Sequence, residues 1–174
     1  DAIAIRFPNN KTMLVDSGPI TASDQFQEYI DEVFFDANYN TFDYVFLTHS
    51  DIDHSGNMEH ILNVYDVKRF YRPRILSNNL EPNIAGFKDD NIVYDQILKT
   101  LVNKDITTYF MTDNVLIDTG AGIIAMYCSL DQSITKTNEF SPILLIESNG
   151  CKVYLGGDSG EDIESEIIQR DVLT

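Results

Sequence analysis

The stretch Phe42-Asp43-Tyr44-Val45-Phe46-Leu47-Thr48-His49-Ser50-Asp51-Ile52-Asp53-His54-Ser55-Gly56-Asn57 decides the fold of this chain. Residues 42–48 form an apolar run of strand length, which is typical of a strand buried on both faces. Two histidines and two aspartates follow within six residues: His49, Asp51, Asp53 and His54. Functional side chains of α/β proteins gather beyond the carboxyl ends of such strands. A lone histidine there is usually structural, but this combination predicts a metal site. Its mixed imidazole and carboxylate ligands suit zinc, manganese or iron.

Strand and helix signals alternate around this stretch. Apolar runs predict strands at residues 2–7 and 11–15, with a turn between them, and then a helix that Thr21 or Ser23 caps and that runs to Phe34. Behind the motif we expect a short helix at 58–65, a strand at 67–71, a long loop at 77–91 and a helix at 94–101. The remainder predicts five strands (107–111, 115–118, 123–128, 143–147 and 151–155), a tight turn at Asn149-Gly150 and a helix at 161–169. This order predicts one α/β domain over residues 1–174, with sheets covered by helices.

The composition is that of a globular domain with an acidic surface. Hydrophobic residues make up 43% of the chain and charged residues 23%, and no apolar run approaches the roughly 20 residues that cross a bilayer. The formal net charge of −16 disfavours strong nonspecific binding to nucleic acid or anionic membranes. Cys128 and Cys151 do not make a disulfide framework. Their apolar, β-like surroundings favour two buried thiols, and a single disulfide is the alternative.

The pattern His-x-Asp-x-Asp-His-x-Gly at residues 49–56 resembles the signature of the metallo-β-lactamase superfamily, usually His-x-His-x-Asp-His. The form with aspartate second is similar to the hydrolase domain of the DNA-uptake competence protein ComEC and its stand-alone relatives. Three further blocks resemble the family in the same order: Met13-Leu14-Val15-Asp16-Ser17-Gly18, Asn138 to Ile146, and Tyr154-Leu155-Gly156-Gly157-Asp158. The resemblance implies an αββα sandwich. It also implies truncation at both ends, because the chain opens inside a strand and residues 171–174 look like the start of another.

The resemblance assigns roles to individual residues. It implies two divalent ions, zinc or manganese, and Asp158 matches the carboxylate that bridges them. Asp53 would also orient the attacking water, which makes it the candidate catalytic residue. Asp16 matches a position that supports the ligand loop without binding metal. The ligands implied are His49 and Asp51 for one ion, Asp53 and His54 for the other, and Asp158 for both.

Two histidines of the family pattern are missing. Asn138 lies nearest to the place of the first, as in ComEC-like sequences, and we expect it to contact substrate. The second is expected beyond Thr174, so a longer protein would supply the last ligand. His60 lies in the helix behind the motif, where a structural role is favoured over metal binding.

The only basic cluster of this acidic chain follows the motif helix, at Lys68, Arg69, Arg72 and Arg74. Arg72 and Arg74 are predicted to reach the rim of the metal site, where paired guanidinium donors suit a phosphate. Ordinary pairing with nearby acids is the alternative.

The leading hypothesis is a phosphodiesterase or nuclease that uses metal-activated water on single-stranded DNA or a small phosphodiester. Hydrolysis of a carboxylic bond (lactone, lactam or thioester) is an alternative that Asp51 disfavours, because such relatives usually keep histidine there. A degenerate binding domain is the third. The domain would lie outside the cytoplasmic membrane within a ComEC-like membrane protein, whereas a stand-alone relative would be cytoplasmic.

Overall fold

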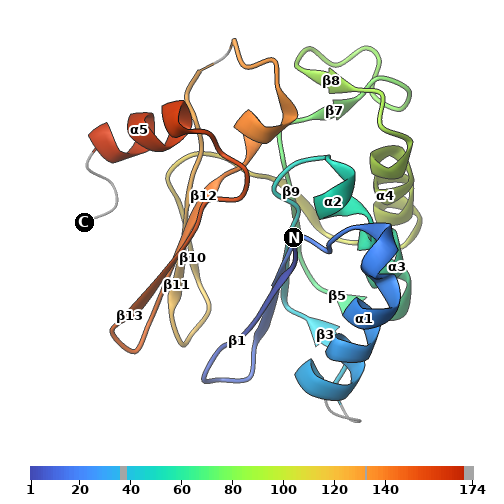
Figure 1. Cartoon of the computed structure of the whole chain (residues 1–174), viewed down its shortest axis with the longest axis vertical. Coiled ribbons are helices and arrows are strands. Elements are labelled where there is room, and N and C mark those ends of the chain that lie inside the picture. Colours follow the sequence, from blue (N-terminus) through green and yellow to red (C-terminus); the bar gives the residue numbers. More distant parts are fainter. Residues whose placement is uncertain (36–38, 132, 171–174) are drawn as a thin grey trace.

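Two β-sheets packed against each other form the centre of the computed structural model, which describes residues 1–35, 39–131 and 133–170 (Figure 1). The first sheet has five strands and the second has four. Helices α3 (Met58–Val64) and α4 (Ile92–Asn103) pack on the outer face of the first sheet, and α5 (Glu161–Gln169) packs on the outer face of the second. The structure therefore has the αββα layering predicted from the sequence.

The five-stranded sheet places the motif at its centre. Its order is β1 (Ile3–Arg6), β2 (Thr12–Val15), β4 (Tyr44–Phe46), β6 (Phe70–Arg72) and β9 (Thr108–Phe110), and all neighbours except β1 and β2 pair in parallel. Alternation along β4 sends Val45 into the core under the helices, and Tyr44 and Phe46 into the core between the sheets. All three side chains are fully buried, which confirms the predicted strand with two buried faces.

The first half of the chain departs from prediction at two points. The predicted strands at 42–48 and 67–71 are both interrupted, so that β3 (Thr41–Phe42) and β5 (Asp66–Val67) pair separately from β4 and β6. Helix α1 (Ser23–Glu28) continues as a π-helical segment, Tyr29–Phe34. Its N-cap is Ala22, without a side-chain hydrogen bond, and the Ser23 hydroxyl instead donates to the carbonyl oxygen of Ile20 at 2.8 Å. The prediction that Thr21 or Ser23 caps this helix is therefore wrong.

The segment predicted as a loop at 77–91 is partly ordered by two short strands. β7 (Leu76–Ser77) and β8 (Lys88–Asp89) pair in parallel. The Ser77 hydroxyl donates to the buried carboxylate of Asp95 in α4 at 2.5 Å. The segment is thus tied to a core helix, which sequence periodicity did not indicate.

The four-stranded sheet is an antiparallel meander of β10 (Val115–Asp118), β11 (Ile123–Tyr127), β12 (Ile143–Ser148) and β13 (Cys151–Leu155). Asn149 and Gly150 join the last two strands with φ angles of 51° and 77°. Positive φ at both positions is what a type I′ hairpin turn requires, so the predicted turn is confirmed. The outer face of the sheet packs against Ile163 and Ile167 of α5.

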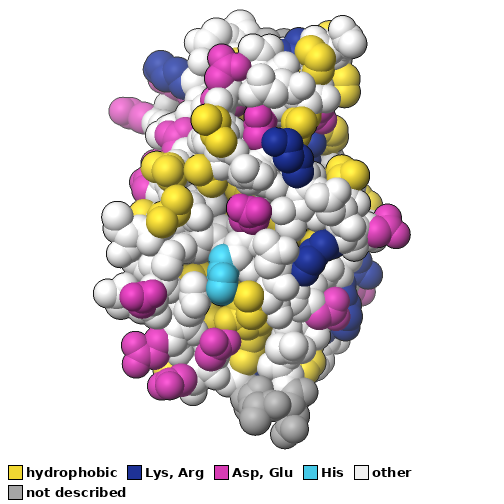
Figure 2. Space-filling view, turned by 90° about the vertical axis from the view of Figure 1, so that its right-hand side faces the viewer, with side chains coloured by type: hydrophobic (Ala, Val, Ile, Leu, Met, Phe, Trp, Pro, Cys, Tyr) yellow, Lys and Arg dark blue, Asp and Glu magenta, His cyan; other side chains and the backbone are white. Residues whose placement is uncertain are grey.

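Acidic side chains are spread over the helix-covered face of the molecule, with Lys and Arg side chains between them (Figure 2). Both cysteines are free: Cys128 is buried as expected, whereas Cys151 is exposed. Among the described residues, no helix is long and apolar enough to cross a membrane. The strand start predicted at residues 171–174 lies outside the described residues.

Candidate metal centre

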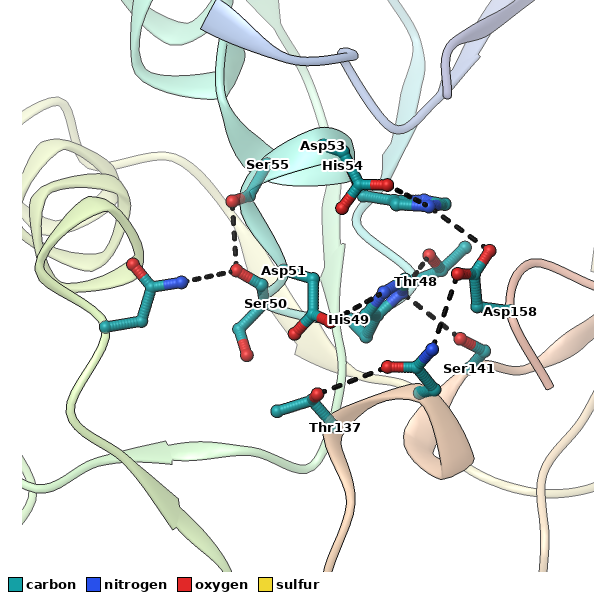
Figure 3. A network of polar contacts seen from close by, with 12 residues as sticks. Thr48, His49, Ser50, Asp51, Asp53, His54, Ser55, Thr137, Ser141 and Asp158 are labelled. Carbon is teal, nitrogen blue, oxygen red and sulfur yellow. Dashed lines mark hydrogen bonds and ion pairs between the residues drawn. The ribbon is translucent and has the colours of Figure 1, made fainter. Parts of the chain in front are cut away.

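The side chains of two motif histidines lie close to Asp158, which follows the last strand of the second sheet (Figure 3). His49 follows β4 and is fully buried, and His54 lies in the short helix α2 (Ile52–Ser55) with 2% exposure. Asp158 comes from the turn after β13, and its Oδ1 lies 3.2 Å from Nε2 of His54. One ligand atom from each of these three residues lies within 4.8 Å of the other two. The structure thus brings together three of the five predicted metal ligands as a compact cluster.

Asp16 fixes the orientation of the His54 ring from behind. Its carboxylate oxygen Oδ2 lies 2.8 Å from Nδ1 of His54 and 2.7 Å from the hydroxyl of Thr48, and Oδ1 accepts from the Thr48 amide at 2.8 Å. A carboxylate can only accept, so Nδ1 of His54 carries the proton and donates it. The lone pair of His54 is then on Nε2, which faces Asp158. Asp16 lies where the sequence placed it, supporting the ligand loop.

The same reasoning applies to His49. The Thr48 hydroxyl has one proton and donates it to Asp16, so at its 3.0 Å contact with Nδ1 of His49 it accepts. The hydroxyl of Ser141 lies 3.2 Å from the same ring nitrogen. Nδ1 of His49 therefore carries the proton, and the lone pair is on Nε2. That Nε2 is buried and has no hydrogen-bond partner among the described residues. A buried nitrogen left unpaired costs about 1–3 kcal/mol, and a bound cation would remove that cost.

The other two predicted ligands lie at the rim of the cluster, each beside one histidine. Oδ2 of Asp51 is 3.8 Å from Nε2 of His49, and Oδ2 of Asp53 is 3.7 Å from Nε2 of His54. The side chains of Asp51 and Asp53 are 40% and 64% exposed. This grouping has the form that the sequence predicted, one His-Asp pair on each side, while metal binding by the two carboxylates stays a prediction.

Burial and charge set the protonation of the two imidazoles in opposite directions. Burial, followed by the nearby His54, lowers the pKa of His49 and favours its neutral, metal-binding form. Burial also opposes protonation of His54, but the hydrogen bond and charge of Asp16 outweigh it, so that the pKa of His54 is raised.

The residues predicted to contact substrate have different surroundings. Nδ2 of Asn138 lies 3.4 Å from Oδ2 of Asp158, beside the cluster, while its contact with substrate stays a prediction. Arg72 is buried, and its guanidinium pairs with Glu81 at 2.9 Å and donates to the Ile75 carbonyl oxygen at 2.7 Å. Because these donors are used inside the fold, Arg72 fits the alternative of pairing with a nearby acid, and we no longer assign it to substrate.

Arg74 is half-buried and lines a cavity of about 520 Å³ together with three phenylalanines. Its hydrogen bond to the Ser129 carbonyl oxygen is long, at 3.4 Å. Of the three histidines, only His60 lies outside the cluster.

Sequence reasoning missed the two hydroxyl residues that orient His49. Thr48 had a signal, because it directly precedes the first histidine at the end of a buried strand. Ser141 lies in the block from Asn138 to Ile146 that resembles the family, but its contact with His49, 92 positions away in sequence, arises only when the two sheets pack.

Comparisons with known proteins agree with this geometry. A family model described as the metallo-beta-lactamase superfamily matches residues 1–83, and no curated protein matches the chain. A HARLDQ-motif mutant of a metallo-β-lactamase from Cronobacter sakazakii has a TM-score of 0.58 and 10% identity, over 97% of this chain and 64% of that one. The metallo-β-lactamase SMB-1 bound to 2-mercaptoethanesulfonate has a TM-score of 0.54 and 14% identity, over 88% of this chain and 55% of that one. Zn(2+)-bound PqqB from Methylobacterium extorquens has a TM-score of 0.52 and 13% identity, over 88% of this chain and 47% of that one.

The chain thus spans about half to two thirds of the length of these proteins. At such low identity the likeness shows the fold alone, whereas the sequence match covers slightly less than half of the chain, including the motif at residues 49–56. The chain has the metallo-β-lactamase fold, and the match over residues 1–83 supports its placement in the metallo-β-lactamase superfamily.

Proposed function

We propose that this chain holds the metal site of a metal-dependent hydrolase that cleaves phosphodiesters. The observation that carries the proposal is the pair of buried imidazoles whose Nε2 lone pairs face one carboxylate, with one of those nitrogens unpartnered among the described residues. Structural histidines normally use both ring nitrogens when buried. Here the hydrogen bonds are confined to the Nδ1 side of both rings, an arrangement typical of metal ligands.

The residues present fit two divalent ions, zinc or manganese, and zinc is the ion named for PqqB. Bound there, such ions would lower the pKa of a water molecule and neutralise negative charge that develops on the substrate. Asp158 lies in one cluster with both histidines, which supports its proposed role as a ligand shared by the two ions. Asp53 has the most exposed carboxylate of the set, so it can accept a proton from water and orient it. The ligands proposed are His49, Asp51, Asp53, His54 and Asp158.

A phosphodiester is favoured over a carboxylic bond by Asp51, Asn138 and Arg74. Asp51 stands where lactamase-type sequences usually keep histidine, and this resemblance to ComEC-like domains extends to Asn138, which lies beside Asp158. Arg74 offers a half-buried guanidinium without a carboxylate partner among the described residues. The negative surface disfavours long duplexes, so a single strand or a small phosphodiester is the proposed substrate.

The test is hydrolysis of bis(p-nitrophenyl) phosphate and of a single-stranded oligonucleotide, each with zinc, manganese or EDTA. Asp53→Ala is expected to lower the rate about 10²–10⁴-fold without unfolding the protein, because this side chain is 64% exposed. Asp24→Ala, at an exposed aspartate in α1, is the matched control and should leave the rate unchanged.

Each other outcome has a definite meaning. Turnover of a β-lactam or a thioester in place of both phosphodiesters would establish the carboxylic-bond alternative. Stoichiometric metal binding with no turnover of any of these compounds would indicate a binding domain. Failure to bind zinc or manganese at all would refute the proposal.

A further inference from the structure

The backbone between two of the proposed ligands is held by side chains from outside the motif. Ser50 lies between His49 and Asp51 and is fully buried. Its carbonyl oxygen accepts from Nδ2 of Asn91 at 2.7 Å, and its hydroxyl donates to Oδ2 of Asp89 at 2.5 Å. A third bond, from the Ser55 hydroxyl to the same carbonyl at 3.0 Å, comes from α2 (Figure 3). The peptide that leads from Ser50 into Asp51 is therefore fixed from three directions.

Asn91 serves two elements at once. Its Oδ1 accepts from the amides of Val93 at 2.9 Å and Tyr94 at 3.4 Å, which makes it the N-cap of α4. Its Nδ2 faces the other way and reaches Ser50. The helix that it caps has 12 residues, and Tyr94 is fully buried in the core. The ligand loop is thus tied to one of the most firmly packed helices of the fold.

This tie matters because Asp51 has little other support. Its carboxylate is 40% exposed and stands 3.8 Å from His49, beyond hydrogen-bonding distance. Among the described residues, no hydrogen bond to this carboxylate holds it in place. The position of Asp51 is then set by its backbone, which is held on one side by Ser50 and on the other by the first turn of α2, whose amides donate to the Asp51 carbonyl.

We propose that Asn91 is a positioning residue of the metal centre, which acts through the Ser50 carbonyl without touching a ligand side chain. The inference rests on the proposed metal site. Removing a residue that orients ligands typically lowers metal affinity 10–100-fold, and we expect about tenfold here, because the bonds from Asp89 and Ser55 remain.

The test separates the two roles of Asn91 by two substitutions. Asn91→Ser keeps an N-cap oxygen, is too short to reach Ser50 and adds no charge, whereas Asn91→Ala removes both functions. Asn103→Ser, at the exposed C-terminal end of the same helix, is the matched control. Three quantities are measured: zinc affinity against a chromophoric chelator, the thermal midpoint in EDTA, and hydrogen exchange of the His54 and Ser55 amides. Both amides donate to the Asp51 carbonyl, at 3.0 and 2.9 Å.

Asn91→Ser is expected to bind zinc about tenfold more weakly and to exchange these two amides faster, at an unchanged thermal midpoint. Unchanged affinity and exchange in a protein that binds zinc would overturn the positioning role and leave the proposed function intact. A wild-type protein that binds no zinc would refute the proposed function. In that case amide exchange is the deciding measurement. Faster exchange in Asn91→Ser but not in Asn103→Ser supports Asn91 as the residue that holds the loop, and unchanged exchange in Asn91→Ser overturns that role. A loss of affinity shared by Asn103→Ser would also overturn it.

Discussion

Replacing Asp16 by asparagine should weaken metal binding while the fold persists. Asp16 is 3% exposed and accepts three hydrogen bonds, two from Thr48 and one from Nδ1 of His54. Its φ angle is 58°, a left-handed conformation that asparagine adopts more readily than most residues. Asp16→Asn therefore preserves the size of the side chain and the backbone conformation. It removes the negative charge and replaces one acceptor oxygen by a donor NH₂ group.

The new amide has only one orientation that suits its neighbours. Its oxygen must remain opposite the amide of Thr48, because an NH₂ group there would face another donor. The NH₂ group then faces the Thr48 hydroxyl and Nδ1 of His54, the partners of the former Oδ2. His54 must accept at Nδ1 and carry its proton on Nε2. The Thr48 hydroxyl, now accepting, turns its proton to His49, whose proton also moves to Nε2. Both lone pairs would point away from the metal.

The expected magnitude follows from these contacts. Loss of a charge-assisted hydrogen bond in the interior costs roughly 1.5–3 kcal/mol of stability. Each imidazole must return to its other tautomer before it can bind metal, against the hydrogen bond that it has gained. We expect zinc affinity to fall about 10–100-fold, which corresponds to about 1.4–2.7 kcal/mol.

The assay combines nitrogen NMR of the histidine rings in EDTA, which reports the tautomers, with zinc titration and urea unfolding. Asp43→Asn is the control: Asp43 is also buried and accepts from the Thr12 amide at 3.0 Å, but it lies before β4, away from the metal site. It should lose stability and keep its zinc affinity. A folded Asp16→Asn protein that binds zinc within twofold of wild type, or keeps the proton on Nδ1 of His54, would refute the reasoning.

Three further predictions concern the rest of the fold. Burial raises the pKa of the Cys128 thiol to about 12, so a thiol reagent at pH 8 should titrate only Cys151 in the native protein and both cysteines in urea. Arg72→Ala should destabilise the fold by about 1.5–3 kcal/mol in urea unfolding, because the half-buried carboxylate of Glu81 loses its charged partner; a loss under 1 kcal/mol would contradict this. Gly56→Ala should lower the free energy of unfolding by about 1–3 kcal/mol and so lower the thermal midpoint, because the new Cβ would lie 2.6–2.9 Å from backbone atoms. An unchanged midpoint would show that the backbone yields there.

The sequence was most informative where the local residue pattern directly reflects the environment of the segment in the fold. The apolar run before His49 predicted a buried strand because β4 has one core on each face. The turn at Asn149 and Gly150 was predictable because few residues tolerate the positive φ that a type I′ turn needs. The candidate ligands from His49 to His54 were predicted from their place beyond that strand, whereas Asp158 was assigned because its block resembles the metallo-β-lactamase family.

Contacts between distant segments were not predictable in this way. Arg72 was assigned to substrate because a basic residue near a predicted rim gives no sign of its partner, and Glu81 lies in a segment that was predicted as a loop. The bond from Asn91 to Ser50 joins residues 41 positions apart, and each residue alone looks like an ordinary loop residue. These contacts depend on how the helices and loops pack against the sheet. The periodicity of hydrophobic residues and the secondary-structure propensities do not encode that packing.

The division of charge in the site explains how the fold tolerates a cluster of ligands. The fully buried positions hold imidazoles, whose neutral form costs little to desolvate and whose orientation is fixed by Asp16, Thr48 and Ser141. The carboxylates of Asp158, Asp51 and Asp53 are 36%, 40% and 64% exposed, so water solvates their charges when no cation does. Burying three unpaired carboxylates would cost several kcal/mol each. Apart from Asp16, whose buried carboxylate accepts three hydrogen bonds, the carboxylates of the site therefore lie at its rim, and the histidines are oriented by hydrogen bonds in the interior.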